Sequence, residues 1–484
     1  MKHFAASLFF AIALTVSAQT NTTRVMSLQD CFAEALKHNF DVQIERYKPQ
    51  LSLYDLYANY GGYDPQFSLG GNHTYNKSGG VFITNAIPIT RENSFDTGLK
   101  GNLPWGMTYD LSGKVSDTTT KESSDGSASV SLTQPLLKDF WTDKPRINIS
   151  IAKNALKISE QGLRQKVIDT ITAVDNAFYE LIYAREKVNV QQQALDLAQK
   201  QLADDQQRVQ IKVMAELGGT IEQDQAQVAQ SRADLISAQF GLASAQNTLK
   251  NLITDNYLKW HDVEIIPSGP MEAVREFFDL QSSWSKGMTQ RPDLIQSRLD
   301  VENQGFNLKY SFNQLFPQLD LTGSYGYNGA GQEFNDSFGQ VQSANRPYYS
   351  YGAKLSIPLS NVAARNAYKS AKVNSQQVLL QLKQIEQKAM VEIDNAVKQA
   401  QSAWEGLEAT RSARVSAEAA LKAEQGKYNA GKSTTFTVLQ LQNRLTSARS
   451  QEIRSLANYN ESLSNLSQQE GSTLERRQID FKVK

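Results

Sequence analysis

Residues 64–71 read DPQFSLGG, and residues 316–323 read FPQLDLTG. The two stretches stand in one register, and the match extends in both directions without a gap. Further matched pairs are Leu28 with Leu280, Asp41 with Asp293, Pro65 with Pro317, and Tyr75 with Tyr327. Segments follow each other in the same order in both halves. The sequence therefore predicts two tandem copies of one unit, each about 200 residues long.

Each unit contains alternating stretches that begin just after the shared proline. In the first unit, Phe67, Leu69 and Tyr75 alternate with Ser, Asn and Thr, and residues 319–328 alternate in the same way. A period of two is typical of a strand with one apolar and one polar face. A returning strand in each unit would complete two hairpins, 67–134 and 319–358. Residues between these segments read as loops. We therefore expect four amphipathic strands per chain.

Long helices follow each hairpin. Proline is absent between Pro145 and Pro267 and again after Pro358. Apolar residues recur every seven positions in the first run, namely Val167, Val174, Leu181, Val188, Leu195, Leu202 and Val209. Such a repeat predicts helices that coil around their neighbours. The expected helical hairpins are 146–255, which turns near residues 215–219, and 362–470, which turns near residues 431–435.

The N-terminal segment has the features of a signal peptide. Lys2 precedes the apolar run FAASLFFAIALTV, and small residues up to Ala18 form a cleavage site. The alternative is a short membrane anchor, but the run is shorter than the ~20 residues that span a bilayer. We expect residues 1–18 to be removed on export. Cys31, the single cysteine, forms no internal disulfide and does not directly follow the cleavage site, so no lipid anchor is predicted.

Composition argues against several classes of function. Lys plus Arg and Asp plus Glu are balanced at 50 each, which gives no sign of a nucleic-acid partner. The four histidines do not stand at metal-ligand spacing on a helix. NAGKST at 429–434 lacks the upstream glycine and strand of a phosphate-binding loop. We therefore expect a protein that is not an enzyme and has no cofactor.

Four strands cannot close a barrel, and an open edge cannot lie in lipid. If the strands cross a membrane, several chains must share one barrel, and three chains would supply 12 strands. The alternative is a small soluble sheet with exposed tyrosines. A periplasmic coiled-coil scaffold or adaptor without a pore is the second class considered, although an adaptor would not normally carry paired amphipathic strands.

The chain resembles the TolC-type outer-membrane efflux protein family over almost the whole mature sequence. The resemblance lies in the tandem units, the QPLL (134–137) and IPLS (357–360) joints between strand and helix, and YNAGKSTTFTVLQLQNRL (428–445) at the second helical turn. It implies a homotrimer in the outer membrane of a Gram-negative bacterium. Its strands would form one shared β-barrel, continuous with a coiled-coil α-helical barrel in the periplasm. A periplasmic adaptor and an inner-membrane pump would dock on the helical turns.

This resemblance divides the chain into segments. After the signal peptide 1–18 comes a first repeat, 19–255, with an opening helix, the strand hairpin 67–134 and the helical hairpin 146–255. An equatorial connector, 256–288, leads into the second repeat, 279–470. That repeat again has a helix, then the strand hairpin 319–358 and the helical hairpin 362–470. A C-terminal tail, 471–484, would join the connector around the tunnel. The implied function is a passive exit duct of a tripartite efflux or type I secretion system.

The resemblance also implies a gate at the helical turns. Tyr428 and Gly431 match the family motif, and Lys432 supplies a positive charge one position before the usual basic site, Ser433. The family's acidic positions fall on Thr437 and Gln440, and on Gly218 in the first unit, where Lys212 replaces the turn glycine. The first-unit turn also contains Glu216 and Gly219. Glu216, Glu222 or Asp224 could replace the missing acids, or each could be a solvated helix charge.

Overall fold

The computed structural model describes residues 23–77, 89–118, 123–210, 220–269 and 271–481, with backbone alone for 208–210 and 220. The predicted signal peptide lies outside these residues. The chain forms two compact units, one of Met1–Ile44, Lys166–Gly287 and Val391–Phe481, and one of Glu45–Gln165, Met288–Met390 and Lys482–Lys484. We name the first the helical unit and the second the sheet unit.

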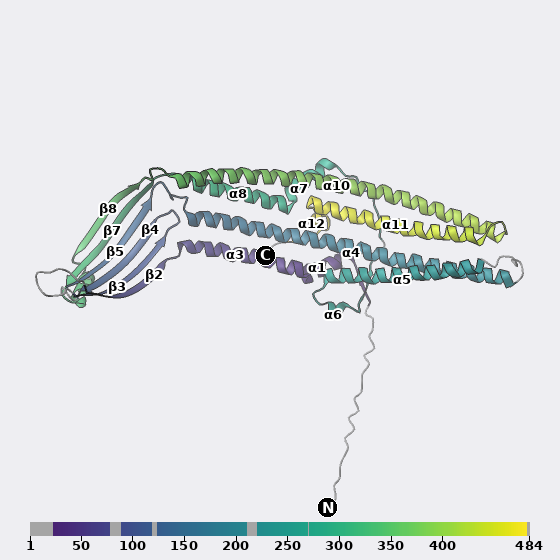
Figure 1. Cartoon of the computed structure of the whole chain (residues 1–484), viewed down its shortest axis with the longest axis horizontal. Helices are drawn as coiled ribbons and strands as arrows, with labels where there is room; N and C mark the ends of the chain where they lie inside the picture. Colours follow the sequence, from purple (N-terminus) through teal and green to yellow (C-terminus); the bar gives the residue numbers. More distant parts are fainter. Residues whose placement is uncertain (1–22, 78–88, 119–122, 211–219, 270, 482–484) are drawn as a thin grey trace, which may run out of the picture. The chain divides into compact units, whose positions relative to one another are not determined.

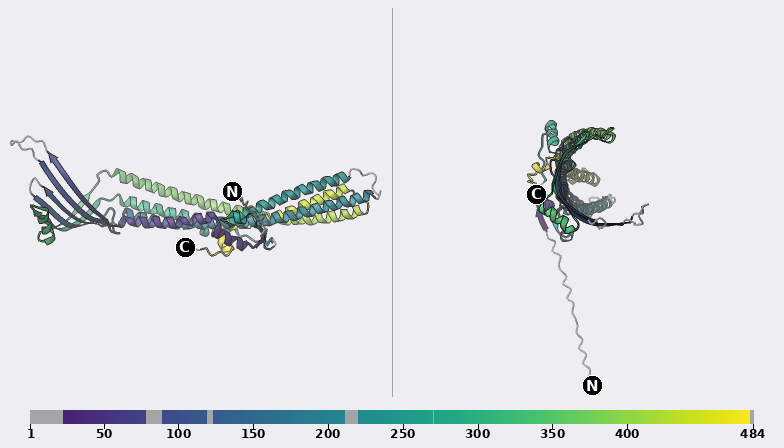
Figure 2. Two further views of the ribbon diagram at one scale, coloured as in Figure 1. Left: turned by 90° about the horizontal axis from the view of Figure 1, so that it is seen from below. Right: turned by 90° about the vertical axis from the view of Figure 1, so that its left-hand side faces the viewer.

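The sheet unit contains one antiparallel sheet of six strands (Figure 1). The strands follow chain order across the sheet. They are β2 (Gln66–Lys77), β3 (Ile89–Asn102), β4 (Thr108–Thr118), β5 (Ser123–Pro135), β7 (Gln318–Gly331) and β8 (Pro347–Ser356). The β5–β7 pair joins the two sequence repeats in one layer, and the strands curve along their length (Figure 2).

The prediction of four strands per chain is therefore wrong, because the described sheet has six. The first repeat supplies four strands instead of two, because residues 107–117 and 127–134, expected together as one returning side, form the two strands β4 and β5, and because β3 was not expected. The sequence of β3, ITRENSFDTGLKGN, is rich in charged and small residues and reads as a loop. Pairing with β2 on one side and β4 on the other satisfies its backbone groups. Tertiary pairing thus overrides a weak local strand propensity.

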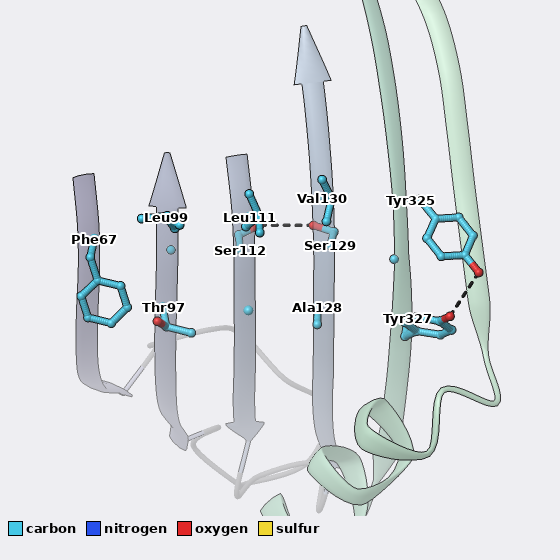
Figure 3. A pocket seen from close by; sticks show the side chains of 13 residues that line it. Phe67, Thr97, Leu99, Leu111, Ser112, Ala128, Ser129, Val130, Tyr325 and Tyr327 are labelled. Carbon is cyan, nitrogen blue, oxygen red and sulfur yellow. Dashed lines mark hydrogen bonds between the residues drawn. The ribbon is translucent and has the colours of Figure 1, made fainter. Parts of the chain in front are cut away.

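The register separates side chains into an apolar and a polar face, as the alternation predicts. Phe67, Leu99, Leu111, Val130 and Tyr325 lie side by side on the apolar face, which Figure 3 shows from close by. The opposite face carries Ser, Thr, Asn and Gly with charged residues. Its charged members are Glu92, Asp96, Lys100, Asp110, Lys114, Asp125, Asp320 and Lys354. Large apolar side chains remain exposed on the apolar face, up to 77% for Leu69 and 84% for Tyr351.

A short helix, α9 (Phe334–Ser343), lies in the β7–β8 connection, where the sequence reads as a loop. It packs on the apolar face over β4, β5 and β7. Gly126 and Gly329 are direct partners, and a side chain at either would meet the Ser337 backbone. The buried Ser337 hydroxyl lies 2.7 Å from that of Ser124. The glycines thus provide the close approach that lets the helix rest on the sheet.

Helices complete the sheet unit. They are α3 (Tyr47–Tyr60), a 3₁₀ turn η1 (Gly61–Tyr63), α8 (Pro292–Asn313), and the first parts of α4 (Lys144–Gln210) and α10 (Val362–Asn429). Leu56 of α3 forms a small core with Ile149 and Ala152 of α4. An ion pair of 3.6 Å joins Arg298 of α8 to Glu386 of α10.

The helical unit is built from the remaining parts of α4 and α10 with a set of further elements. These are β1 (Thr23–Met26), α1 (Leu28–His38), α2 (Phe40–Glu45), α5 (Thr220–Ile253), α6 (Tyr257–Trp260), β6 (Glu264–Pro267), α7 (Leu280–Gln290), α11 (Thr435–Glu470) and α12 (Thr473–Arg476). Val167, Val174, Leu181 and Leu195 are buried, which confirms the predicted heptad row in α4 at these four positions. Val188 and Leu202 are partly exposed, and the side chain of Val209 lies outside the described residues. Among the helices that the structure describes, none combines the length and the hydrophobicity of a transmembrane span.

A buried ion pair anchors the end of the chain to α4. The Asp175 carboxylate is inaccessible to solvent, and the Arg477 guanidinium contacts it at 2.8 Å. The Ser464 hydroxyl of α11 donates a hydrogen bond of 2.7 Å to the same carboxylate. Burial raises the pKa of Asp175, and Arg477 opposes that rise.

We expect Arg477→Ala to destabilise the fold by about 3–5 kcal/mol, because it leaves a buried carboxylate without its cation. Arg476→Ala is the matched control. Arg476 forms a 2.6 Å pair with Glu276 in which both side chains are about one-third exposed, so its loss should cost about 1 kcal/mol or less. Denaturant unfolding followed by circular dichroism measures both. Equal losses for the two variants would contradict the assigned role of the buried pair.

Candidate gate at the helical turns

The turn between α10 and α11 is ordered by backbone geometry. Gly431 has a φ of +71°, a conformation that favours glycine, and its N–H donates to the Tyr428 carbonyl at 3.0 Å. The Lys432 N–H donates a second hydrogen bond, of 2.9 Å, to the Lys427 carbonyl. Thr434 then caps α11 by accepting from the Thr437 N–H at 3.4 Å. A short rigid turn results, and it fixes where Tyr428 and Thr435 point.

Both residues point at one carboxylate of the other hairpin. The Tyr428 hydroxyl donates to Oδ1 of Asp205 on α4. The Thr435 hydroxyl donates to Oδ2 of the same group at 2.8 Å, and Gln201 Nε2 donates to it at 3.1 Å. All four side chains are at most 4% exposed. Because hydrogen bonds to a charged acceptor are the stronger kind, this cluster ties the α4–α5 hairpin to the α10–α11 hairpin.

A second carboxyl, Asp224 of α5, completes the cluster. It is 1% exposed, and neither of its carboxyl oxygens has a hydrogen-bond partner within the described residues. Burial, together with the negative charge of Asp205, raises the pKa of Asp224 to about 7. Asp224 therefore holds a proton in acidic solution and is then neutral beside the Asp205 carboxylate. We name Gln201, Asp205, Asp224, Tyr428 and Thr435 the gate cluster.

The residues predicted for the gate fall in different places. Tyr428 is in the gate cluster, and Gly431 forms the turn. The Lys432 side chain is exposed, and only the backbone N–H of this residue forms a hydrogen bond within the part of the chain that the structure describes. Ser433 donates to Glu424 at the end of α10, and Thr437 bonds Thr434. Gln440 is exposed. The predicted residues of the first turn, Lys212, Glu216, Gly218 and Gly219, lie outside the described residues.

Asp205 is the residue that sequence reasoning missed, although a signal for it exists. Leu195, Ala198, Gln201 and Asp205 are all buried, and their spacing of three or four residues continues one face of α4. An acid on that buried face must have a partner. Asp224 stands likewise on the face of α5 that buries Ser231, Leu235 and Ala238. Within the described residues, no group of three or more potential ligands could hold a metal ion.

A groove of about 520 Å³ lies close to the turn, between α5 and α11. Its lining residues are Gln223, Ala226, Gln227, Gln230, Phe436, Leu439, Gln440 and Asn443. Gln227 and Asn443 exchange two amide hydrogen bonds of 2.9 and 3.0 Å across it. Phe436 is 63% exposed. An exposed aromatic ring beside a polar groove has the chemistry of a protein-binding surface.

Comparison with known proteins identifies the class. The outer membrane efflux protein family matches residues 33–254 and 285–472. The chain belongs to this family, and the resemblance read from the sequence is confirmed. A curated relative is the pyoverdine export outer membrane protein OpmQ of Pseudomonas aeruginosa. It is 24% identical over 344 residues, which span 69% of this chain and 67% of OpmQ.

Solved structures show the same fold. The outer membrane channel CmeC of Campylobacter jejuni matches with a TM-score of 0.68 at 16% identity, over 92% of this chain and 86% of CmeC. The outer membrane protein VceC of Vibrio cholerae matches with a TM-score of 0.67 at 17% identity, over 92% of this chain and 96% of VceC.

Proposed function

We propose that the protein is the exit duct of a tripartite efflux or type I secretion system in a Gram-negative outer membrane. Three copies would join their sheets into one barrel in the membrane. Their helices would form the tunnel through which a pump and an adaptor deliver cargo. Transport through the duct is passive. The segment 1–18 would be removed on export, and the segments 256–288 and 471–484 would form the band around the tunnel.

The observation that carries this proposal is the two-faced sheet. Its apolar face exposes large side chains such as Leu69 and Tyr351, a surface that suits lipid tails. Charged side chains lie on the opposite, polar face of the same strands. Such a face suits a water-filled lumen. A soluble sheet would cover its apolar face with helices, whereas α9 packs over parts of β4, β5 and β7 and against Phe95 of β3, and leaves Leu69 and Tyr351 exposed.

The gate cluster supplies the closure. Its hydrogen bonds join two helical hairpins at their turns, so breaking them would let the hairpins move apart. No cation is needed for this lock, because the donors to Asp205 are hydroxyl and amide groups of the chain itself. We therefore place the gate on Asp205 with Tyr428 and Thr435, and we retain Gly431 for the turn.

The groove beside the turn is the proposed adaptor-docking surface. We expect Phe436→Ala to lower cargo export in cells at least about fivefold, because an aromatic anchor at an interface centre is worth about 1–2 kcal/mol or more. The variant should keep the wild-type conductance after purification, since Phe436 lies outside the gate cluster. Phe240→Ala is the control, because Phe240 is an even more exposed ring, at 76%, farther along α5 and outside the groove. Export that is unchanged in Phe436→Ala would remove the groove from the docking surface.

The direct test of the proposed function is ion conductance of the purified protein in a planar lipid bilayer. We expect a small conductance that is mostly closed, because the gate cluster is fully formed. A preparation that inserts and never conducts, in the wild type or in a gate variant, would contradict the exit duct.

A further inference from the structure

We propose that all six strands of each chain stand in the barrel wall, so that three copies form an 18-stranded barrel with a wide, hydrated lumen. This inference rests on the proposed function. It departs from the 12-stranded barrel that four strands per chain would give. The evidence lies in the register of the sheet and in its two end strands.

The strand ends are staggered in the way that barrel closure requires. Direct partners connect Gln66 of β2 through β3, β4, β5 and β7 to Ser350 of β8. β2 begins at Gln66, but β8 continues six residues past Ser350 to Ser356 (356 − 350 = 6). At the opposite end, β2 extends eleven residues past this line to Lys77 (77 − 66 = 11), and β8 extends three to Pro347 (350 − 347 = 3). At both ends of the sheet, β8 is therefore displaced from β2 in the same direction along the strands, by six residues at one end and by eight at the other (11 − 3 = 8).

The stagger corresponds to a definite strand tilt. A step of six to eight residues over five strand-to-strand intervals, at ~3.3 Å per residue and ~4.8 Å between strands, gives a tilt of about 40–48°. Barrel strands are typically tilted by about 35–45°. The whole sheet, β2 and β3 included, is thus already a segment of a barrel wall. A hairpin standing outside the wall would not share this progression.

The end strands are suited to pair between copies. β2 and β8 are the ends of the six-stranded sheet, and with an even number of alternating strands they run antiparallel to each other. If the stagger continues from one copy to the next, Gln66 of one chain meets Ser356 of its neighbour. Both residues lie on the polar face, so the apolar faces of adjacent copies are continuous. Closure of the ring also removes the two open edges from lipid.

The strand number sets the width of the lumen. With these spacings, 18 strands give a backbone-to-backbone diameter of about 36 Å and 12 strands give about 24 Å. Subtracting about 5 Å of side chain on each side leaves about 26 Å and about 14 Å. The polar face that lines this space carries charges of both signs, from acidic residues and from lysines. The cargo class that fits is a bulky, hydrated solute, and selection would occur at the gate cluster and not in the barrel.

Cysteine cross-linking in outer-membrane vesicles tests the wall. We would compare the double variant Gln66→Cys/Ser356→Cys, which probes β2 against β8 of a neighbour, with Thr108→Cys/Ser356→Cys, which probes β4 against β8. Native Cys31 is fully buried, and burial raises its pKa to about 12, so it should not compete under mild oxidation. We expect disulfide-linked dimers and trimers only from the first variant.

The outcomes distinguish failure of the 18-stranded barrel from failure of the proposed function. Cross-links from Thr108→Cys/Ser356→Cys instead would place β2 and β3 outside the wall, and a trimer without either cross-link would also overturn the 18-stranded barrel. Neither of these two results would contradict the exit duct. Absence of any trimer in detergent would refute the proposed function, and the barrel with it.

Labelling with a water-soluble maleimide gives an independent readout. Cysteines on the polar face of β3 and β4, Asp96→Cys and Ser112→Cys, should react at least about tenfold faster than the apolar-face variants Thr97→Cys and Leu111→Cys, because only the polar face meets water. Equal rates on both faces would show that the hairpin lies outside the lipid, and would overturn the inference.

Discussion

Asp205→Ala should raise the open probability of the duct by about 100-fold or more. The substitution removes the acceptor of hydrogen bonds from Tyr428, Thr435 and Gln201. Hydrogen bonds to a charged group contribute about 1.5–3 kcal/mol each. A tenfold change in an equilibrium constant corresponds to about 1.4 kcal/mol. A loss of about 3 kcal/mol from the closed state therefore shifts the closed-to-open equilibrium by more than about 100-fold. Single-channel recording in planar bilayers measures the change.

The adjacent acid provides the control for this experiment. Asp204 is exposed on the same turn of α4, so Asp204→Ala makes the same change in charge without touching the gate cluster. Its open probability should remain within about twofold of the wild type. Tyr428→Phe, which removes one donor and keeps the ring, should give an intermediate increase of about tenfold. If Asp205→Ala and Asp204→Ala behave alike, the gate cluster does not hold the duct closed.

The second large effect is an increase in open probability of about 30-fold as the pH rises from 5 to 7. The pKa of Asp224 is raised in the closed state to about 7, from 3.8. A group with a raised pKa stabilises the folded arrangement fully below its unperturbed value, and this contribution is lost as the pH rises to the raised value. Each pH unit within the window corresponds to about 1.4 kcal/mol. Above about pH 7 Asp224 is ionised in the closed state as well, and the curve should become flat.

Asp224→Asn isolates this effect. The amide is neutral and close in size to the protonated acid, but it cannot ionise. The variant should therefore remain closed, with the pH dependence between 5 and 7 reduced to less than about threefold. A wild-type steepness that persists in Asp224→Asn would assign the titration to another group. An open probability that rises on acidification, the opposite sign, would exclude protonated Asp224 as part of the lock.

Regular patterns predicted most of the fold from the sequence. The alternation in residues 67–75 has the period of a strand, and the register confirms that these side chains share a face with Leu99 and Val130. The heptad row in α4 likewise predicted the buried seam. The β3 strand escaped because its polar positions carry Glu92, Asp96 and Lys100, and a strand that borders water on one face need not look like a strand locally.

The gate was predictable only in part. The motif at 428–445 pointed to Tyr428 and to the turn at Gly431, since both depend on local sequence. Its partner Asp205 is more than 200 residues away in the chain, and the register of two packed helices decides which of two neighbouring acids meets the tyrosine. Asp204 and Asp205 differ only in the face of α4 on which they stand. One sequence cannot place that face without knowledge of the neighbouring hairpin.

The most direct test of the central claim is the mass of the particle extracted from outer membranes, measured by light scattering with and without detergent. The proposed duct predicts a trimer in detergent, about three times the mass of the mature chain, that aggregates when detergent is removed, because the apolar face of the sheet then meets water. A particle that stays soluble and uniform in size without detergent would contradict it.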